Sequence, residues 1–324
     1  MSEKIGFIGL FPTVKPEIFM ESADFVVKGE AENFFLAEKE LLSLQGIYEP
    51  QEIDDINTLP FPDWSRVPAE KSRHAPFFGN KKMFPVIFGR GCSFSCAYYC
   101  AYPIIGGRKI RQRSIQNMID ELKYLKSTFD AQAVLFRDPN FSIIRKTTVE
   151  LCNAIIDADL RMDWAVETHP DRLDKELLGL MKKAGCQAIT IGVESRTKEV
   201  LKASKRQDVK EEHLREVVHY AEKIGISIMA GYILGQMEDT EDTLDATIKY
   251  AIELGTSYAQ FVIATPYPGT SFYIEVENQL TTKDWTQYDT YTLVFQHPNL
   301  SSTIFSFTVR YLSSTKEMTE SIPY

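Results

Sequence analysis

Between Met83 and Ala264, short apolar runs alternate with longer stretches in which apolar residues recur every three or four positions. The longer stretches are typical of amphipathic helices that cover a core with one stripe, and the short runs are typical of buried strands. Strands that alternate with helices predict βα units and a parallel sheet. Six strands are expected, over residues 84–88, 133–136, 162–166, 188–193, 226–234 and 258–264. The predicted fold class is α/β, a partial (β/α)6 TIM-like barrel over residues 83–283.

The residues before this pattern predict a short α/β unit over 1–49, with strands at Ile5–Gly9 and Asp24–Lys28 and helices after Pro16 and over Ala31–Leu44. Residues 50–82 predict an extended, Pro-rich linker, because they hold five prolines: Pro50, Pro60, Pro62, Pro68 and Pro76. Beyond residue 283 the βα rhythm stops, and residues 284–324 form a tail with no clear pattern.

Composition narrows the class of protein. The 324 residues are 44% hydrophobic, enough for a sizeable core, and the net charge of −9 argues against a broad nucleic-acid surface. No apolar run approaches the length of a membrane span and no cleavable signal pattern opens the chain. Five cysteines do not suggest a disulfide framework, so a reducing cytoplasm is expected. One compact basic run is either a solvated turn or a site for an anionic substrate or cofactor tail: Arg108, Lys109, Arg111 and Arg113.

Three cysteines fall in the stretch RGCSFSCAYYCAYP, at Cys92, Cys96 and Cys100. Thiolates are soft ligands that select zinc, copper(I) or iron–sulfur clusters, and structural zinc usually takes four protein ligands. Cys152 and Cys186 lie far away in apolar patterns typical of buried cysteine. Three ligands leave one metal position open, which favours a reactive 4Fe–4S cluster.

Polar residues interrupt the apolar runs at the ends of the predicted strands, where a parallel barrel carries its active site. They are Asp138, Asn140, Glu167, His169, Glu194 and Ser195. Asp138 and Ser195 are also good helix N-cap residues, and a lone histidine such as His169 is more often a satisfied polar residue than a base. The fifth strand ends in GYILGQME, where strand glycines mark a close approach by a backbone or ligand.

At these residues the sequence resembles the radical S-adenosylmethionine (radical SAM) superfamily, whose three cluster cysteines follow the first strand of a parallel barrel. Its Gly-x-Ile-x-Gly-x-x-Glu pattern matches Gly231, Ile233, Gly235 and Glu238. The cysteine spacing is one residue longer than usual before Cys100, which Tyr98 or Tyr99 would supply as a bulge.

The resemblance implies a 4Fe–4S cluster and SAM as cofactors, a small-molecule substrate and an electron donor such as flavodoxin or ferredoxin. It implies that Tyr99 packs adenine, which also lies against the fifth strand, and that Asp138 or Asn140 holds the methionine amino group. Glu194 and Ser195 match contacts to the ribose and carboxylate, and Glu167 joins the cofactor-binding rim. No catalytic side chain is assigned.

The stretch FPTVKPEIFMESADFVVKGEAE resembles the closing part of the cobalamin-binding domain found in one radical SAM subfamily. That subfamily often carries an Asp-x-His-x-x-Gly motif, which this sequence lacks, so we expect a truncated domain that does not retain cobalamin. The expected reaction is methyl transfer or oxidative rearrangement, such as ring closure, at an unactivated carbon. The alternative is a non-catalytic barrel remnant that binds at most a metal or a partner.

Overall fold

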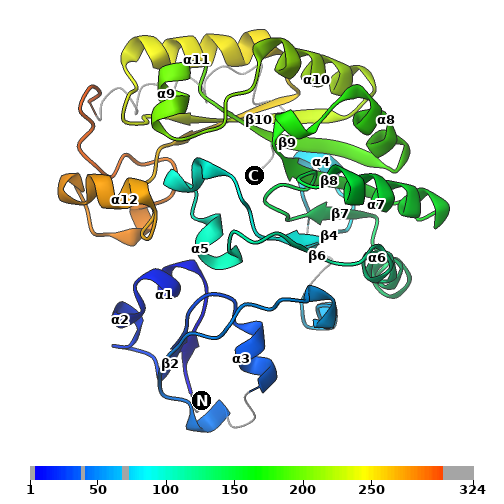
Figure 1. The fold of residues 1–324 in the computed structure, drawn as a ribbon, viewed down its shortest axis with the longest axis horizontal. Helices are drawn as coiled ribbons and strands as arrows, with labels where there is room; N and C mark the ends of the chain where they lie inside the picture. The colour runs from blue at the N-terminus through cyan, green and yellow to red at the C-terminus, as the bar shows by residue number, and fades with distance from the viewer. Residues whose placement is uncertain (1–3, 38–40, 68–72, 302–324) are drawn as a thin grey trace.

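Six parallel strands form the main sheet of the computed structural model, which describes residues 4–37, 41–67 and 73–301 (Figure 1). The strands are β4 (Met83–Val86), β7 (Ala133–Phe136), β8 (Asp163–Thr168), β9 (Cys186–Glu194), β10 (Ser227–Leu234) and β11 (Tyr258–Ile263). They pair in this order along the sheet, each parallel to its neighbour. All six predicted strands and the α/β class are confirmed. The carboxyl ends of the strands therefore meet at one rim.

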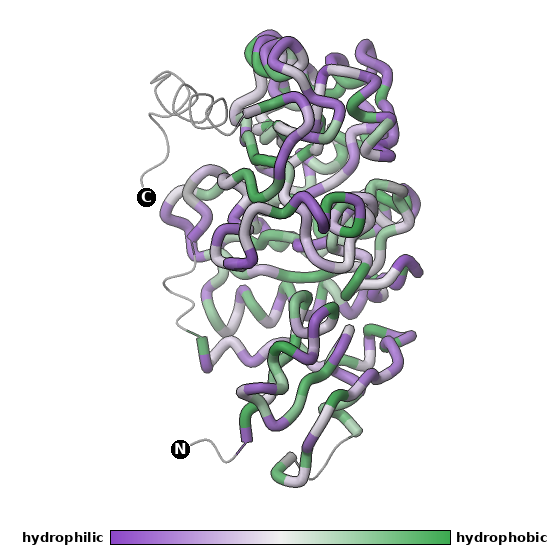
Figure 2. Tube along the Cα trace, turned by 90° about the vertical axis from the view of Figure 1, so that its left-hand side faces the viewer, coloured by the Kyte–Doolittle hydropathy of each residue, from purple (hydrophilic) through white to green (hydrophobic). Residues whose placement is uncertain are grey.

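Helices cover the outer face of this sheet (Figure 1). They are α6 (Ile115–Phe129), α7 (Arg145–Asp157), α8 (Lys175–Lys183), α9 (Lys198–Ala203), α10 (Glu211–Lys223) and α11 (Glu241–Leu254). Figure 2 shows hydrophilic and hydrophobic residues interspersed along the tube, as expected where many elements are amphipathic. In the sequence, Leu214, Val217, Val218, Ala221 and Ile224 are spaced to form one core-facing stripe; the first four are buried in α10, and Ile224, which follows the helix, is half-buried. None of the helices in the described ranges is long and apolar enough to cross a membrane.

The inward face of the sheet carries small side chains near the start of the strands. Ala133, Ala165 and Ala188 are fully buried there and leave room for Phe78 of the short helix α4 (Ala75–Phe78). The Tyr258 hydroxyl on β11 donates a hydrogen bond of 2.7 Å to the carbonyl of Pro76. This segment therefore fills the amino end of the barrel interior, and the opposite rim stays available for a site.

The N-terminal residues form a separate parallel sheet of three strands, β1 (Gly6–Phe7), β2 (Phe25–Val27) and β3 (Gly46–Tyr48), with helices α1 (Leu10–Val14), α2 (Pro16–Phe19) and α3 (Glu32–Ala37). It lies at the bottom of Figure 1, in blue. The predicted helix after Pro16 and both predicted strands are present, although β1 and β2 are shorter than expected. Of the helix predicted over Ala31–Leu44, the structure describes α3 and a three-residue helix at Leu41–Ser43, and residues 38–40 lie outside the described ranges. The short β3 and α1 were not predicted. We call residues 4–37 and 41–49 the N-terminal unit.

The Pro-rich segment is packed rather than freely extended. Ile53 and Ile56 are buried, and Trp64 packs edge-on against Phe84 of β4 with ring centroids 5.4 Å apart. Three-residue helices at Ile56–Thr58 and Trp64–Arg66 make this segment shorter than a fully extended chain.

Part of the predicted tail is also ordered. After α12 (Ser271–Val276), Leu280 pairs with Phe295 in an antiparallel bridge, and Phe295 and Leu300 are buried. Residues 302–324 of that tail lie outside the described ranges.

Candidate functional site

The three cysteines lie on one loop, residues 91–110, which we call the cysteine loop. It connects β5 (Gly89–Arg90) and β6 (Arg111–Gln112), which pair antiparallel, and contains the helix α5 (Tyr102–Gly106). A short helical turn covers Ser95–Tyr98, and the N–H of Cys100 donates to the carbonyl of Cys96 at 3.0 Å. Residues four apart in a helical turn share a face, so this turn keeps the two cysteines on the same side of the loop.

The additional residue in the cysteine spacing is therefore taken up in a helical turn. Tyr98 has defined contacts: its hydroxyl donates to Glu275 at 2.8 Å, and its ring packs against Phe272 at 5.6 Å. Both partners belong to α12, which lies beside the cysteine loop. The longer spacing thus attaches the loop to the chain after the barrel.

The three cysteines share one cavity of about 270 Å³ with several residues predicted from the strand ends. Tyr99 comes from the loop itself, and the strand-end residues that the cavity brings together with it are Asn140, Glu167, His169, Glu194 and Gly231. They come from the carboxyl ends of successive strands or the residues that follow them, which is why one rim collects them. Glu167 also pairs with Arg137 at 2.6 Å, at the more exposed side.

Three cysteine thiolates are the type of ligand that holds a 4Fe–4S cube. Within the described ranges, no three His, Cys, Asp or Glu side chains are already close enough to hold one metal ion. In a cube each cysteine binds a different iron, so its ligands are spaced more widely than those of a single ion. Burial raises the pKa of Cys96, and it raises that of Cys100 to about 11. Without a cation these thiols stay protonated, and a metal would replace the protons.

Other predicted residues lie outside this cavity. The carboxylate of Asp138 is buried and accepts hydrogen bonds from the backbone N–H groups of Phe88 and Gly89, so it holds the entry to the cysteine loop. Burial raises the pKa of Asp138 to about 7. Ser195 lines a neighbouring polar cavity, and its hydroxyl accepts from the N–H of Thr197 at 3.1 Å in the turn before α9, whose N-cap is Thr197.

The glycine motif divides between two places. Gly231 lines the cavity of the cysteines, whereas Ile233 and Glu238 line a smaller cavity of about 90 Å³ that they share with Tyr99. Gly235 has a positive φ of 79°, and its N–H donates to Asp239 at 2.9 Å. Gly235 therefore forms a turn, and a residue with a side chain would be strained in this backbone conformation.

Arg206 is a site residue that sequence reasoning missed. Its guanidinium donates to the Gly192 carbonyl at 2.6 Å and lies 3.9 Å from the sulfur of Cys96. It also lies 3.7 Å from the carboxylate of Glu194, whose pKa is raised by burial and lowered by this arginine. In the sequence nothing distinguishes Arg206 from Lys202 and Lys205 nearby.

His169 stacks on Phe94 of the cysteine loop, with ring centroids 4.8 Å apart and planes inclined by 22°. Its Nδ1 accepts a hydrogen bond from the N–H of Asp171 at 3.3 Å. Burial, with smaller contributions from Arg206 and Arg172, lowers the pKa of His169 to about 3. The imidazole is therefore neutral at ordinary pH and is a poor general base.

The basic run after the cysteines is used within the chain. Arg108 donates to the carbonyls of Ser93 and Phe94 inside the loop. The remaining three side chains pair with carboxylates, in the pairs Lys109–Asp54, Arg111–Glu30 and Arg113–Glu121. Arg108 and Lys109 thus remain exposed to solvent, whereas Arg111 and Arg113 are held in buried or nearly buried ion pairs.

A larger cavity, of about 770 Å³, lies between the N-terminal unit and the cysteine loop, and we call it the interface cavity. Apolar side chains such as Ile8, Leu36 and Ile105 line much of it, together with Glu30 and Arg90. Tyr102 lines both the interface cavity and the cavity of the cysteines, so it separates the two.

A parallel barrel with three cysteines on the loop after its first strand defines an iron–sulfur enzyme class. The chain belongs to the radical SAM superfamily, whose family model matches residues 86–251, just over half of the 324 residues. This membership implies a 4Fe–4S cluster and SAM.

The chain is similar to an uncharacterized methyltransferase of Pyrococcus horikoshii, with 28% identity over 303 residues that cover 86% of this chain and 64% of that protein. It is 27% identical over 239 residues to an anaerobic magnesium-protoporphyrin IX monomethyl ester cyclase of Rubrivivax gelatinosus, covering 73% and 42% of the two chains. This chain thus spans less than two thirds of each relative.

Among solved structures, the cobalamin-dependent SAM radical enzyme OxsB, with aqua-cobalamin and SAM bound, aligns with a TM-score of 0.58 at 15% identity. The alignment covers 98% of this chain and 50% of OxsB. At this identity the likeness shows a shared fold.

Proposed function

We propose that this chain is a radical SAM enzyme whose reaction is methyl transfer or oxidative rearrangement at an unactivated carbon of a small molecule. One observation carries the proposal: the three loop cysteines and the strand-end residues Asn140, Glu167, Glu194 and Gly231 line a single cavity. The methyltransferase and cyclase names of the relatives support these two reaction types.

Each cavity residue has a part in this proposal. Cys92, Cys96 and Cys100 would hold the cluster, and a cube with three cysteine ligands would keep one iron available for SAM. The carboxylates and the Asn140 amide hold hydroxyl and ammonium groups of SAM by hydrogen bonds and charge. Tyr99 offers a flat apolar surface for adenine, and Gly231 lets the ring lie against β10.

The cluster would supply one electron, and SAM would supply the 5′-deoxyadenosyl radical that takes a hydrogen atom from the substrate. We propose a flavodoxin or ferredoxin as the source of the electron. The neutral His169 and the buried Arg206–Glu194 pair help to keep the cavity dry and ordered around SAM, which limits side reactions with water.

We propose that any contact of this chain with cobalamin is weak, and that the interface cavity is the place where the cofactor would lie. The cavity lies between an α/β unit and the barrel, and among the described residues Tyr102 is the one that lines both this cavity and that of the cysteines. OxsB, which binds aqua-cobalamin, shares the fold over 98% of this chain.

The test is anaerobic reconstitution with iron and sulfide, followed by iron analysis and chromatography for 5′-deoxyadenosine. The parent is expected to hold about four iron atoms per chain and to cleave SAM. Replacing Cys92, Cys96 or Cys100 by alanine should abolish both properties. Cys152→Ala is the matched control, because that thiol is buried in α7 away from the loop.

Two outcomes would contradict the proposal. A parent that binds no iron after reconstitution would favour the non-catalytic barrel. A Cys152→Ala variant that loses iron as completely as the loop variants would show that the three loop cysteines are not the ligand set.

A further inference from the structure

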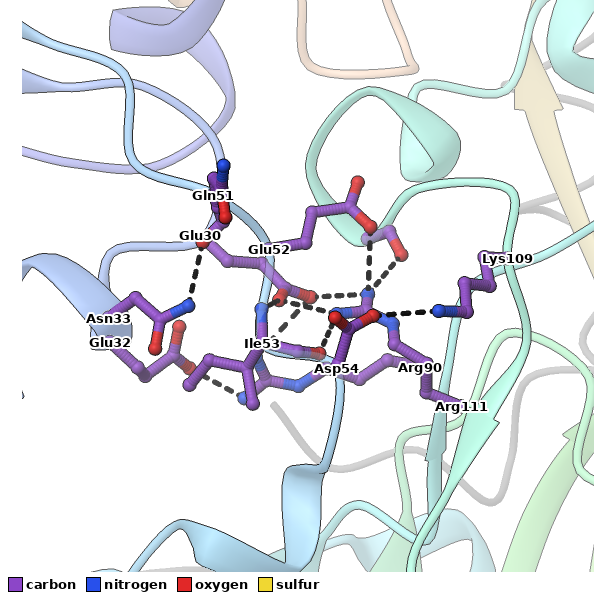
Figure 3. Close-up of polar contacts among 11 residues, drawn as sticks. Glu30, Glu32, Asn33, Gln51, Glu52, Ile53, Asp54, Arg90, Lys109 and Arg111 are labelled. Atoms are coloured by element: carbon purple, nitrogen blue, oxygen red, sulfur yellow. Dashed lines mark hydrogen bonds and ion pairs between the residues drawn. The ribbon is translucent and has the colours of Figure 1, made fainter.

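One carboxylate of the N-terminal unit contacts both ends of the cysteine loop (Figure 3). Glu30 accepts two hydrogen bonds from Arg111, each of 2.7 Å, in a bidentate pair. Its Oε1 also lies 3.4 Å from Nη1 of Arg90. Arg90 immediately precedes the cysteine loop and Arg111 immediately follows it.

This contact is deeply buried. The side chains of Arg111 and Glu30 are each 3% exposed. Arg111 also donates to the carbonyls of Ile53 and Gly106, at 2.7 and 2.8 Å. Removing one partner of a buried ion pair leaves an uncompensated charge without water, so the arrangement is held firmly while both partners are present.

Arg90 has a second contact on the same unit, because it donates to Glu32 at 2.6 Å. The two arginines sit on the paired strands β5 and β6, where they are register partners. The loop between them holds all three cysteines, and its other charged contacts to the described part of the N-terminal unit and the Pro-rich segment are exposed to solvent. One of these, Lys109–Asp54, joins side chains that are 67% and 86% exposed.

We propose that Glu30 is a positioning residue for the three cysteines. By binding the arginines at both ends of the cysteine loop, it fixes the distance between those ends and so the placement of the thiols between them. The N-terminal unit is then a structural part of the cluster site, whether or not it binds a cofactor of its own. This inference depends on one part of the proposed function, namely that the cysteine loop holds a cluster.

The experiment measures how fast iron leaves the reconstituted cluster when a ferrous chelator is added in excess under anaerobic conditions. Glu30→Gln keeps the shape of the side chain but leaves both arginines without their shared charge. We expect iron release to be faster by about tenfold or more in Glu30→Gln, and by a few-fold in Glu32→Gln, which weakens only the Arg90 contact. Asp54→Asn, on the exposed pair, should match the parent.

A loss of overall stability must be separated from a loss of positioning. Leu177→Ala removes a fully buried side chain of α8 and serves as a destabilised control in which the contacts of Glu30 with Arg90 and Arg111 are intact. Its melting temperature should fall, while iron release and the electron paramagnetic resonance spectrum of the reduced cluster with SAM stay as in the parent. In Glu30→Gln that spectrum should change. Arg111→Lys, which keeps the charge without the bidentate fork, should lie between the two.

The inference fails if Glu30→Gln releases iron at the parent rate, or if Leu177→Ala accelerates release as much as Glu30→Gln does. If Glu30→Gln does not fold, the iron-release rate of Glu32→Gln is the test. A rate equal to that of the parent would then contradict the proposal that these carboxylate–arginine contacts position the cysteine loop. A parent that binds no iron at all would instead remove the proposed function, so the two failures are distinguishable.

Discussion

The carboxylate of Glu194 lies 3.7 Å from the guanidinium of Arg206, with both side chains almost fully buried, at 13% and 11% exposure. Glu194 ends β9, and Arg206 lies beyond α9, so the pair closes the loop that follows the fourth strand of the barrel. Both residues also line the cavity of the cysteines, so the pair contributes charge to that cavity and helps to fix its shape.

Replacing Arg206 by methionine should weaken SAM binding by about tenfold or more, because Glu194 becomes a buried carboxylate without a charged partner, and the loss of the arginine raises its pKa further. Calorimetric titration of the reconstituted protein measures this affinity. Arg196→Gln is the matched control, since Arg196 pairs with Glu211 at 2.8 Å with both side chains about 40% exposed. Equal affinity in a folded Arg206→Met variant would contradict a site role for this arginine.

Gly231→Val should block SAM binding and leave the protein folded. A Cβ at Gly231 would first meet the Ile191 carbonyl at 3.7 Å, an ordinary contact, so the added side chain fills the cavity and spares the fold. Gly235→Val, in contrast, should lower stability by about 1–3 kcal/mol because of the positive φ there. Circular dichroism melting and SAM titration of both variants distinguish these effects. Parent-like affinity in Gly231→Val would place SAM elsewhere.

Asp138 should make stability fall with rising pH. Its pKa in the fold, about 7, lies above the ordinary value of 3.8, so protonation favours folding. This contribution is complete below about pH 4 and is lost as pH rises through 7. Between about pH 5.5 and pH 8, the unfolding free energy of the parent should fall by about 2 kcal/mol relative to Asp138→Asn, which does not titrate. Urea unfolding of both proteins at the two pH values is the measurement, and parallel pH profiles would refute the shift.

The 324-residue chain should retain little cobalamin by itself. Ile8 and Leu36 of the interface cavity are 54% and 59% exposed, so the cavity is open to solvent on that side, and no histidine is among the described residues that line it. An open, unliganded cavity does not bury a large cofactor well. Hydroxocobalamin added before desalting, with corrin absorbance read against protein, tests this. Stoichiometric retention would make cobalamin-dependent methyl transfer the leading function.

Local patterns were sufficient for the barrel. Each of the six strands is a short apolar run between amphipathic helices. The spacing of apolar residues and the length of each run can both be read from neighbouring residues in the sequence. The short β3 and helix α1 carry too few residues to show a period, so they were missed. Residues 50–67 were expected to be extended because of their prolines, yet Ile53, Ile56 and Trp64 find apolar partners that the local sequence does not show.

By itself the sequence determined the superfamily, the cysteine loop and the rim residues, because these follow from spacing along the chain and from the rule that parallel strands end together. Only the tertiary structure decided which rim residues share the cavity, that Asp138 and Gly235 serve the backbone, and that Arg206 joins Glu194. It also placed Glu30 on Arg111, 81 positions away. Such contacts depend on how the N-terminal unit and the barrel pack, and a buried charge is recognised only once its partner is known.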